Sequence, residues 1–253
     1  MSIVAFTIFG VSVHWYGIMI ALGILFAVLL AFYVFKFRDL KSDYIFELLL
    51  WILPPAIIGA RLYYLIFNGG PWGLEAFKIW NGGLAVYGSI IGGALGVVLF
   101  CLVRKVNFFE VADAMVPSLA LGQAFGRIGC CFGGCCYGVE TTNPNFMCFP
   151  FSLNIDGVWH LATNFYESVF DFLICLALVL MIRKIGIKGV IMGAYFAFYG
   201  ILRAVLECFR DAHEALFIGS IKVSFLLSIL LAVMGVAIIV TQVVRQKYKK
   251  RIS

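Results

Sequence analysis

Seven long apolar stretches limit what this chain can fold into. Each has roughly 20 mostly apolar residues, the length at which an α-helix crosses the hydrocarbon core of a bilayer. They lie near residues 15–35, 45–67, 84–103, 113–132, 166–182, 189–209 and 223–244. The second and fourth also carry charged residues and prolines, so other counts, such as six, stay open. The pattern predicts an all-α, polytopic membrane protein with seven transmembrane helices.

The composition excludes a soluble fold. Of the 253 residues, 63% are hydrophobic and only 13% are charged, whereas a soluble domain ordinarily has about 25% charged residues. No low-complexity or Ser/Pro-rich linker divides the chain, so we expect a single transmembrane domain over residues 1–253. The first basic residue is Lys36, after the first apolar stretch. A signal peptide has the opposite order, so we expect the first span to be retained.

Basic residues gather in alternate loops, which predicts an orientation. Thirteen of the 19 fall on one side of the membrane: Lys36, Arg38, Lys41, Arg104, Lys105, Arg183, Lys184, Lys188, Arg245, Lys247, Lys249, Lys250 and Arg251. By the positive-inside rule this side is the cytoplasm, so the N-terminus lies outside and the C-terminus inside. Because the two termini then lie on opposite sides of the membrane, the chain must cross it an odd number of times. The basic tail explains much of the net charge of +6 as an anchor on anionic lipid, so we expect no nucleic-acid partner.

Two segments outside the spans then face the outer side. Residues 68–83 hold Trp72 and Trp80 between charged residues, which is typical of an interfacial segment with its indoles at headgroup depth. Residues 135–165 form the longest loop, and we expect a small extracytoplasmic cap there. Chemistry is therefore expected on the outward side.

The stretch over residues 122–138, GQAFGRIGCCFGGCCYG, places Arg127 among glycines at the end of an apolar segment. A guanidinium that faces lipid loses its hydration, so intramembrane charges usually face a protein interior or a wet cavity. Arg127 is accordingly the first candidate for a functional site.

Glycines recur at every fourth position along three stretches. These are Gly88, Gly92 and Gly96, then Gly122 and Gly126, then Gly129 and Gly133. In a membrane such spacing lets helix backbones approach closely, so we interpret these glycines as packing positions.

The sixth apolar stretch carries Tyr199, Arg203 and Glu207, which lie four residues apart and hence on one helical face. One interpretation is an internal ion pair that neutralises both charges. Arg127 and Arg61 are additional intramembrane cations that a single carboxylate does not need. Arginines that converge from different helices would form a phosphate site, because guanidinium binds phosphate bidentately. A phospholipid headgroup is the phosphate expected at that depth.

Further polar residues stand at the outer ends of the spans. Glu167 and Asp171 share a face of the fifth stretch, and three interpretations stay open: they orient an arginine, act as a proton acceptor, or remain solvated at the interface. His14 and Tyr16 stand at the mouth of the first stretch, where an amphipathic anchor is the simpler interpretation and Tyr16 is in reach of a headgroup.

The four cysteines after Arg127 leave two alternatives open. Cys130, Cys131, Cys135 and Cys136 lack the C-x-x-C pairs of a zinc site and have no neighbouring His, so no metal site is predicted. In an oxidising compartment a disulfide among them or to Cys148 is plausible. A membrane thiol oxidoreductase is therefore a rival function.

Several sequence blocks together resemble the bacterial prolipoprotein diacylglyceryl transferase family. They are HWYG at 14–17, IWNGGLAVYGSIIGG at 79–93, GRIG at 126–129, FYES at 165–168 and YGILRAVLECFR at 199–210. The blocks follow the family order over nearly the whole chain. The resemblance implies seven spans with the N-terminus outside. It also implies an enzyme that moves the diacylglyceryl group of phosphatidylglycerol to a lipobox cysteine thiol of a preprolipoprotein and releases glycerol phosphate.

The resemblance also implies roles for residues. Arg127 and Arg203 match arginines regarded as essential in the family, and Tyr16, Tyr199 and Glu207 match positions that line the same cavity. The chain departs from the family at three places: Tyr87 replaces a histidine favoured as general base, Cys130 replaces an asparagine, and Gly133, Gly134 and Cys135 replace an Asn-Gly-Glu sequence. Our candidate catalytic residues are therefore Arg127, Arg203, Tyr87 and Glu207, and our candidate substrate-binding residues are Tyr16, Arg61, Tyr199, Glu167, Gly129, His14 and Cys130.

The sequence as a whole predicts a diacylglyceryl transferase of the bacterial cytoplasmic (inner) membrane. Its partners are phosphatidylglycerol, other membrane lipids and lipobox-containing preprolipoproteins, and we expect a monomer without a cofactor. The departures at Tyr87, Cys130 and Cys135 leave open a related transferase with a different lipid donor or acceptor. A non-catalytic lipid-binding or transport protein has no repeat of discontinuous helices in its favour.

Overall fold

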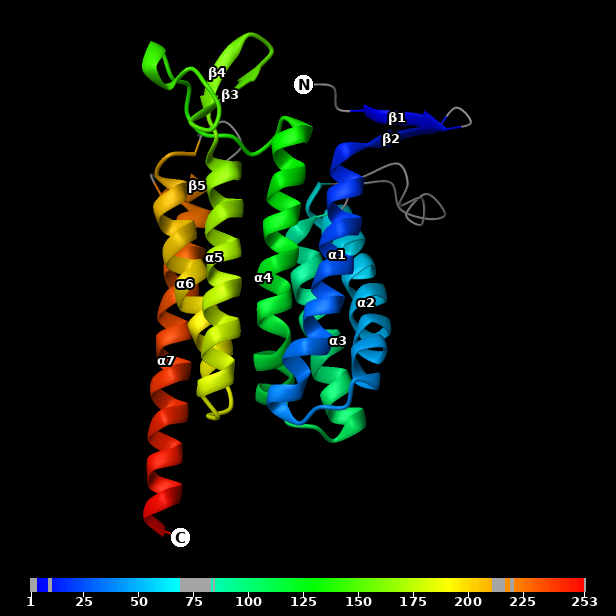
Figure 1. Cartoon of the computed structure of the whole chain (residues 1–253), viewed down its shortest axis with the longest axis vertical. Helices are drawn as coiled ribbons and strands as arrows, with labels where there is room; N and C mark the ends of the chain where they lie inside the picture. Colours follow the sequence, from blue (N-terminus) through cyan, green and yellow to red (C-terminus); the bar gives the residue numbers. More distant parts are fainter. Residues whose placement is uncertain are drawn as a thin grey trace. The chain divides into compact units, whose positions relative to one another are not determined.

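The computed structural model describes residues 4–8, 11–68, 83, 85–210, 217–218 and 221–252 (Figure 1). These residues are mostly helical. The long helices are α1 (Trp15–Val34), α2 (Asp43–Asn68), α3 (Val86–Arg104), α4 (Phe108–Gly133), α5 (Thr163–Lys184), α6 (Val190–Glu207) and α7 (Val223–Ile252). A helix lies at each of the seven predicted stretches, and six of them are long and apolar enough to cross a membrane. The prediction of a polytopic helical membrane protein is confirmed.

The helix outside this group of six is α4, which carries three charged residues, Glu110, Asp113 and Arg127. It begins at Phe108 rather than at residue 113, because Asn107 precedes it as an N-cap. The Phe109 N–H donates to Asn107 Oδ1 at 2.9 Å. At the other end of the chain α7 continues through the basic tail to Ile252, since Lys and Arg are good helix formers.

Short hairpins and turns join the helices and qualify the all-α prediction. The three antiparallel pairs are β1 (Val4–Ile8) with β2 (Val11–His14), β3 (Ser152–Ile155) with β4 (Val158–Leu161), and β5 (Phe217–Ile218) with β6 (Ile221–Lys222). Short 3₁₀ turns are η1 (Phe35–Arg38) and η4 (Pro144–Phe146). The β3–β4 pair lies in the segment predicted as a cap. Its two-residue turn, Asp156 and Gly157, has positive φ at both positions, as a type I′ hairpin requires.

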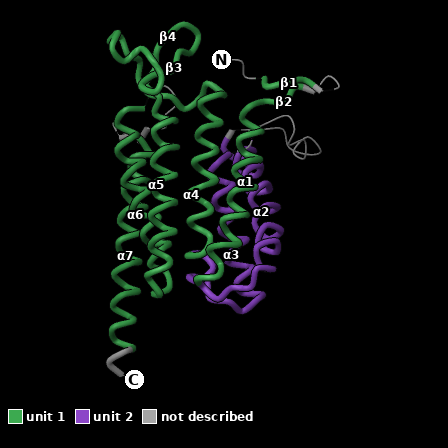
Figure 2. Tube along the Cα trace, viewed as in Figure 1, with its two compact units in different colours: residues 1–37, 113–253 green, residues 38–112 purple. Residues whose placement is uncertain are grey.

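The chain forms two compact units (Figure 2). Unit 1 comprises residues 1–37 and 113–253, and unit 2 comprises residues 38–112, which include α2 and α3. The single-domain prediction stays a prediction. Residues 69–82, which make up most of the predicted interfacial segment at 68–83 and include Trp72 and Trp80, lie outside the described residues.

In unit 2, glycines bring α2 and α3 into backbone contact. A Cβ added to Gly88 would lie 2.1 Å from Gly59 O, and one added to Gly92 would lie 2.0 Å from Pro55 O. Gly96 lies equally close to Trp51 O, a carbonyl that Pro55 leaves without its usual helical donor. The packing interpretation is confirmed for Gly88, Gly92 and Gly96.

The same interpretation is wrong for Gly122 and Gly126, where an added Cβ would meet nothing within 4 Å. The close contact between α1 and α4 instead comes from Gly23, whose Cβ would lie 2.9 Å from Phe125 Cβ. Aromatic stacking continues this contact, because Phe26 lies 5.3 Å from Phe125 and Trp15 lies 5.5 Å from Phe132 between ring centroids.

Polar side chains attach α4 to the other helices of unit 1. Ser168 Oγ of α5 donates to Ala124 O at 2.9 Å. The buried carboxylate of Asp113 accepts from the backbone N–H groups of Gly189 and Met192, both at 2.8 Å, and so caps the N-terminus of α6 from a neighbouring helix. In turn α6 packs along α7, where a Cβ on Gly200 would lie 2.6 Å from Ala232 N.

We predict that Gly92→Ala destabilises the protein, whereas Gly122→Ala does not. The new methyl at position 92 would collide with Pro55 O, so α2 and α3 must separate. Overpacking of this kind costs about 1–3 kcal/mol. The methyl at position 122 meets open space and adds helix propensity. Thermal unfolding of the two purified variants in detergent measures the difference, and equal midpoints would contradict the packing argument.

Candidate active site

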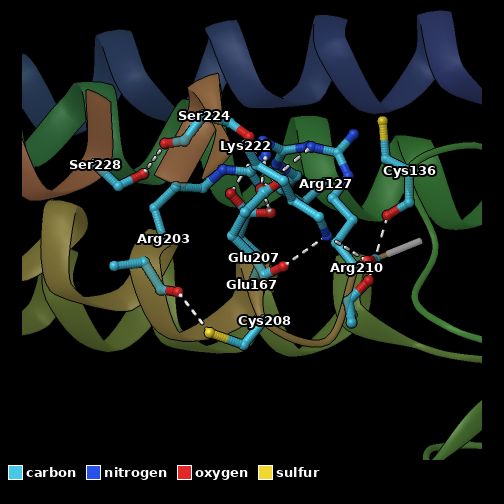
Figure 3. Close-up of polar contacts among 12 residues, drawn as sticks. Arg127, Cys136, Glu167, Arg203, Glu207, Cys208, Arg210, Lys222, Ser224 and Ser228 are labelled. Atoms are coloured by element: carbon cyan, nitrogen blue, oxygen red, sulfur yellow. Dashed lines mark hydrogen bonds and ion pairs between the residues drawn. The ribbon is translucent and has the colours of Figure 1, made fainter. Parts of the chain in front are cut away.

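Three helices of unit 1 bring two arginines onto one carboxylate (Figure 3). Glu167 near the start of α5 places Oε1 3.0 Å from Arg127 Nη2 of α4 and Oε2 3.0 Å from Arg203 Nη1 of α6. The Glu167 side chain is only 4% exposed, and those of Arg203 and Arg127 are 13% and 22% exposed. The two arginines that the sequence selected therefore lie together, with Glu167 between them.

A second carboxylate extends the cluster. Arg203 Nη2 lies 3.1 Å from Glu207 Oε2, so the ion pair expected within α6 is present. Arg210 Nη1 also approaches Glu207 Oε2, at 3.9 Å. Lys222, just before α7, donates from Nζ to the backbone carbonyls of Glu207 at 3.1 Å and Arg210 at 2.8 Å. Arg203 thus forms ion pairs with both Glu167 and Glu207, and not with Glu207 alone.

The charges of the cluster favour an anionic ligand. Three arginines and Lys222 surround the carboxylates of Glu167 and Glu207. Within the described residues Arg127 bonds only through Nη2, so its Nε–H and Nη1–H groups are available to a ligand. A guanidinium edge of this kind matches the oxygens of a phosphate.

Asp171 lies one turn after Glu167 and is fully buried. Neither of its carboxylate oxygens has a hydrogen-bond partner among the described residues. The sequence interpretation of a solvated interfacial carboxylate is therefore wrong for Asp171.

Tyrosines line the α6 side of the cluster. Tyr199 OH donates to Glu167 Oε1 at 3.4 Å. Its ring stacks on Tyr195 at 5.8 Å between centroids, and Tyr195 OH donates to Gln123 Oε1 of α4 at 2.6 Å. On the α1 side Tyr16 packs against Gly129, where an added Cβ would lie 3.0 Å from Tyr16 Cδ2. These tyrosines hold α1, α4 and α6 around the arginines.

A tight turn follows Arg127 and folds the cysteines back on α4. Gly134 has φ of +62°, and the Cys135 N–H donates to Cys130 O at 3.2 Å, which is the pattern of a Schellman motif. The first turn of α5 holds the loop, because Asn164 Nδ2 donates to Cys135 O at 3.1 Å and Thr163 Oγ1 donates to Cys136 O at 3.4 Å.

This turn gathers three thiols. The Sγ atoms of Cys130, Cys135 and Cys136 all lie within 4.8 Å of one another, so these residues could hold a metal ion. All eight cysteines of the chain are in the thiol form. Hydrogen bonds from Cys130 and Cys135, with the charges of Arg210 and Arg127, lower the pKa of the Cys136 thiol.

Three predicted site residues have other surroundings or contacts than those of the arginine cluster. His14 is exposed at the end of β2, directly before α1. Arg61 and Tyr87 belong to unit 2. There Arg61 Nη1 donates to Gly83 O at 3.2 Å, and the ring of Tyr87 lies 6.2 Å from that of Tyr63.

Sequence reasoning did not select Arg210, Lys222 or Tyr195 as site residues. Arg210 had a local signal, since it follows Glu207 by three positions. Tyr195 had one too, since it precedes Tyr199 by four positions and so shares its helical face. Lys222 had none, because its contacts depend on the β5–β6 connection.

Comparison with known proteins identifies one family. Its model, described as prolipoprotein diacylglyceryl transferase, matches residues 3–241. A phosphatidylglycerol–prolipoprotein diacylglyceryl transferase of Finegoldia magna is 38% identical over 100% of this chain and 98% of its own length. Proteins of the same name from Clostridium botulinum strain Loch Maree and, numbered 1, from Clostridium perfringens strain 13 are 35% and 36% identical. These two alignments cover 98% and 99% of this chain, and 99% and 98% of the relatives.

The matched region contains all the helices that form the arginine cluster, from α4 with Arg127 to α6 with Arg203. The family model and the full-length relatives both cover nearly the whole chain. The chain belongs to the prolipoprotein diacylglyceryl transferase family.

Proposed function

We propose that this protein transfers the diacylglyceryl group of phosphatidylglycerol to the thiol of a lipobox cysteine in a prolipoprotein. The sulfur attacks the glyceryl carbon that carries the phosphate, and a thioether bond forms. The bond from this carbon to the phosphate oxygen breaks, and glycerol phosphate leaves with the electron pair. The thiol proton passes to solvent or to a base. The names of the full-length relatives support this donor and this acceptor.

The observation that carries the proposal is the arrangement of Arg127, Glu167 and Arg203. Two guanidinium groups from different helices flank one buried carboxylate in segments that we place within the membrane. Glu167 uses one oxygen for each arginine and so fixes the direction of both. We assign Arg127 and Arg203 to the departing phosphate, on which negative charge develops. Hydrogen-bond donors held in place and directed at such developing charge usually make the largest single contribution to catalysis.

The other candidates take supporting roles in this proposal. Glu207 and Tyr199 orient Arg203 and Glu167, which they contact directly. Tyr16 and Gly129 form the α1–α4 contact beside Arg127, and we assign them, with His14 and Cys130, to substrate binding. We assign Tyr87 to a hydrogen bond with an ester or phosphate oxygen and Arg61 to lipid binding. Both roles rest on the sequence.

A second candidate function is a related transferase with another lipid donor or acceptor. Tyr87 at the family's histidine position and the cluster of Cys130, Cys135 and Cys136 favour it. Expression in a bacterial strain depleted of its own transferase separates the two functions. Rescue of growth supports the first function, and failure by a well-inserted protein supports the second.

The topology is part of the proposal. We propose seven spans in the bacterial inner membrane, with the N-terminus outside, the C-terminus in the cytoplasm and the segment at 135–165 as an outer cap. Partners on α5 and α6 for the polar side chains of α4 support its place as a span, because they shield those side chains from lipid.

We predict that Arg127→Ala and Arg203→Ala each lower the rate of transfer to a lipobox peptide by about 100- to 1000-fold, the usual effect of removing one such donor. Arg127→Lys should fail as well, because an ammonium cannot replace the bidentate fork. In Arg127→Ala the Glu167 carboxylate keeps its bond to Arg203, so the fold should persist. Transfer in membrane vesicles measures the effect.

Arg104→Ala is the matched control, since Arg104 forms an exposed pair with Glu47 at 2.7 Å and lies in unit 2. Such pairs contribute about 0–1 kcal/mol, so this variant should transfer at the normal rate. Normal rates for the Arg127 and Arg203 variants would refute the site.

We also predict that a fluorescent protein fused after residue 253 is bright and that alkaline phosphatase fused there is inactive. The basic residues of α7 favour the cytoplasmic side, where the phosphatase cannot form its disulfides. Phosphatase activity at this end would overturn the proposed orientation. The same fusion placed in the 135–165 segment should be active and serves as the control.

A further inference from the structure

The three thiols of Cys130, Cys135 and Cys136 are close to the geometry of a metal site. Their Sγ atoms lie within 4.8 Å of one another. In a tetrahedral zinc–thiolate site each Zn–S bond is about 2.3 Å, which separates the sulfur atoms by about 3.8 Å. Side-chain rotations that move the sulfurs by about 1 Å therefore suffice to close the site around one ion. The three residues come from one turn, so no helix has to move.

The ligand set narrows the choice of ion. Three thiolates select soft or borderline ions, chiefly Zn²⁺ and Cu⁺. Zinc sites that serve catalysis have three protein ligands and one open position, whereas structural sites have four. A zinc ion with three thiolates carries a net charge of −1. Arg210 and Arg127, which both interact electrostatically with Cys136, compensate this charge.

We propose that Cys130, Cys135 and Cys136 bind a zinc ion whose open position takes the acceptor thiol. This inference rests on the proposed transferase function and names how its nucleophile is activated. A thiol loses its proton to water when it coordinates zinc. The bound sulfur attacks the glyceryl carbon, and the carbon–oxygen bond to the phosphate breaks. The thioether that forms is neutral and a weaker ligand, so it leaves the ion.

The fold places this site beside the arginine cluster. Cys130 follows Arg127 by three residues on α4, so both side chains project from the same helical face. Asn164, which holds Cys135 O, precedes Glu167 by three residues on α5. Tyr16 of α1 packs against Gly129, which directly precedes Cys130. Nucleophile and departing phosphate would thus be held by the same two helix ends.

Metal activation also fits the departure at Tyr87. A metal-bound thiolate needs no side-chain base, so tyrosine at a position where the family has histidine does not prevent the reaction. The sequence pattern gave no indication of this site, because the ligands at 130, 135 and 136 do not have C-x-x-C spacing.

Metal binding is tested on the full-length protein in lipid nanodiscs, reduced and then loaded with zinc alone. We expect one zinc per chain and X-ray absorption that shows three sulfur ligands at about 2.3 Å. Cys130→Ser, Cys135→Ser and Cys136→Ser should each weaken zinc binding at least about 100-fold. Cys131→Ser is the matched control, since Cys131 neighbours Cys130 but lies outside the cluster, and it should bind zinc normally. A fully reduced protein that binds no zinc, or one that binds only Cu⁺, would overturn the proposal.

A lipobox peptide tests the open position separately from catalysis. Its addition should raise the sulfur count at zinc from three to four, and a peptide with Ser in place of the acceptor Cys should not. Chelation should abolish transfer, and zinc but not Mg²⁺ should restore it. If the triple Ser variant transfers at the normal rate, the metal inference fails and the transferase function stands. If the zinc-loaded protein gains the fourth sulfur but transfers no lipid, the transferase function fails and the activation role with it.

Discussion

The carboxylate of Glu167, shared between Arg127 and Arg203, is the interaction on which the rest of the site depends. Each guanidinium alone would be costly in an apolar helix bundle, and so would the carboxylate. Together they satisfy one another only if α4, α5 and α6 keep their relative positions. Removing the shared carboxylate would leave both arginines without it, and breaking a buried ion pair in this way typically destabilises by about 3–5 kcal/mol. The cluster therefore both orders unit 1 and holds two cations ready for an anion.

Helix α4 has the composition that this arrangement requires. Among the seven long helices of the described residues it is the one outside the six that are long and apolar enough to cross a membrane, yet its polar groups have partners within unit 1. Asp113 caps α6 near one end, Gln123 accepts from Tyr195 in the middle, and Arg127 meets Glu167 near the other end. A helix of this kind crosses a membrane only when neighbouring helices supply those contacts.

The end of α4 joins two kinds of chemistry. Gly134 allows the left-handed turn that returns Cys135 to Cys130, and Thr163 and Asn164 hold the loop at the start of α5. The same start of α5 carries Glu167. Groups suited to a phosphate and groups suited to a soft metal ion therefore both lie at the end of α4 and the start of α5. Holding a lipid and a thiol close together in this way favours a reaction between them.

The sequence by itself determined the seven helices, because only a helix of about 20 residues satisfies its backbone hydrogen bonds across a bilayer. It also identified Arg127 and Arg203, since the cost of a buried charge is visible in a list of residues, and Gly88, Gly92 and Gly96 as packing positions. The β3–β4 hairpin had a local signal in Asp156–Gly157.

Only the tertiary structure decided which groups meet. It made Glu167 the shared partner of both arginines, left open space where a Cβ on Gly122 or Gly126 would lie, and gathered three thiols that lack a metal-binding sequence pattern. The physical reason is the separation along the chain between the residues that interact. Helix length and periodicity depend on neighbouring residues, whereas contacts between helices depend on how the intervening turns return the chain through space.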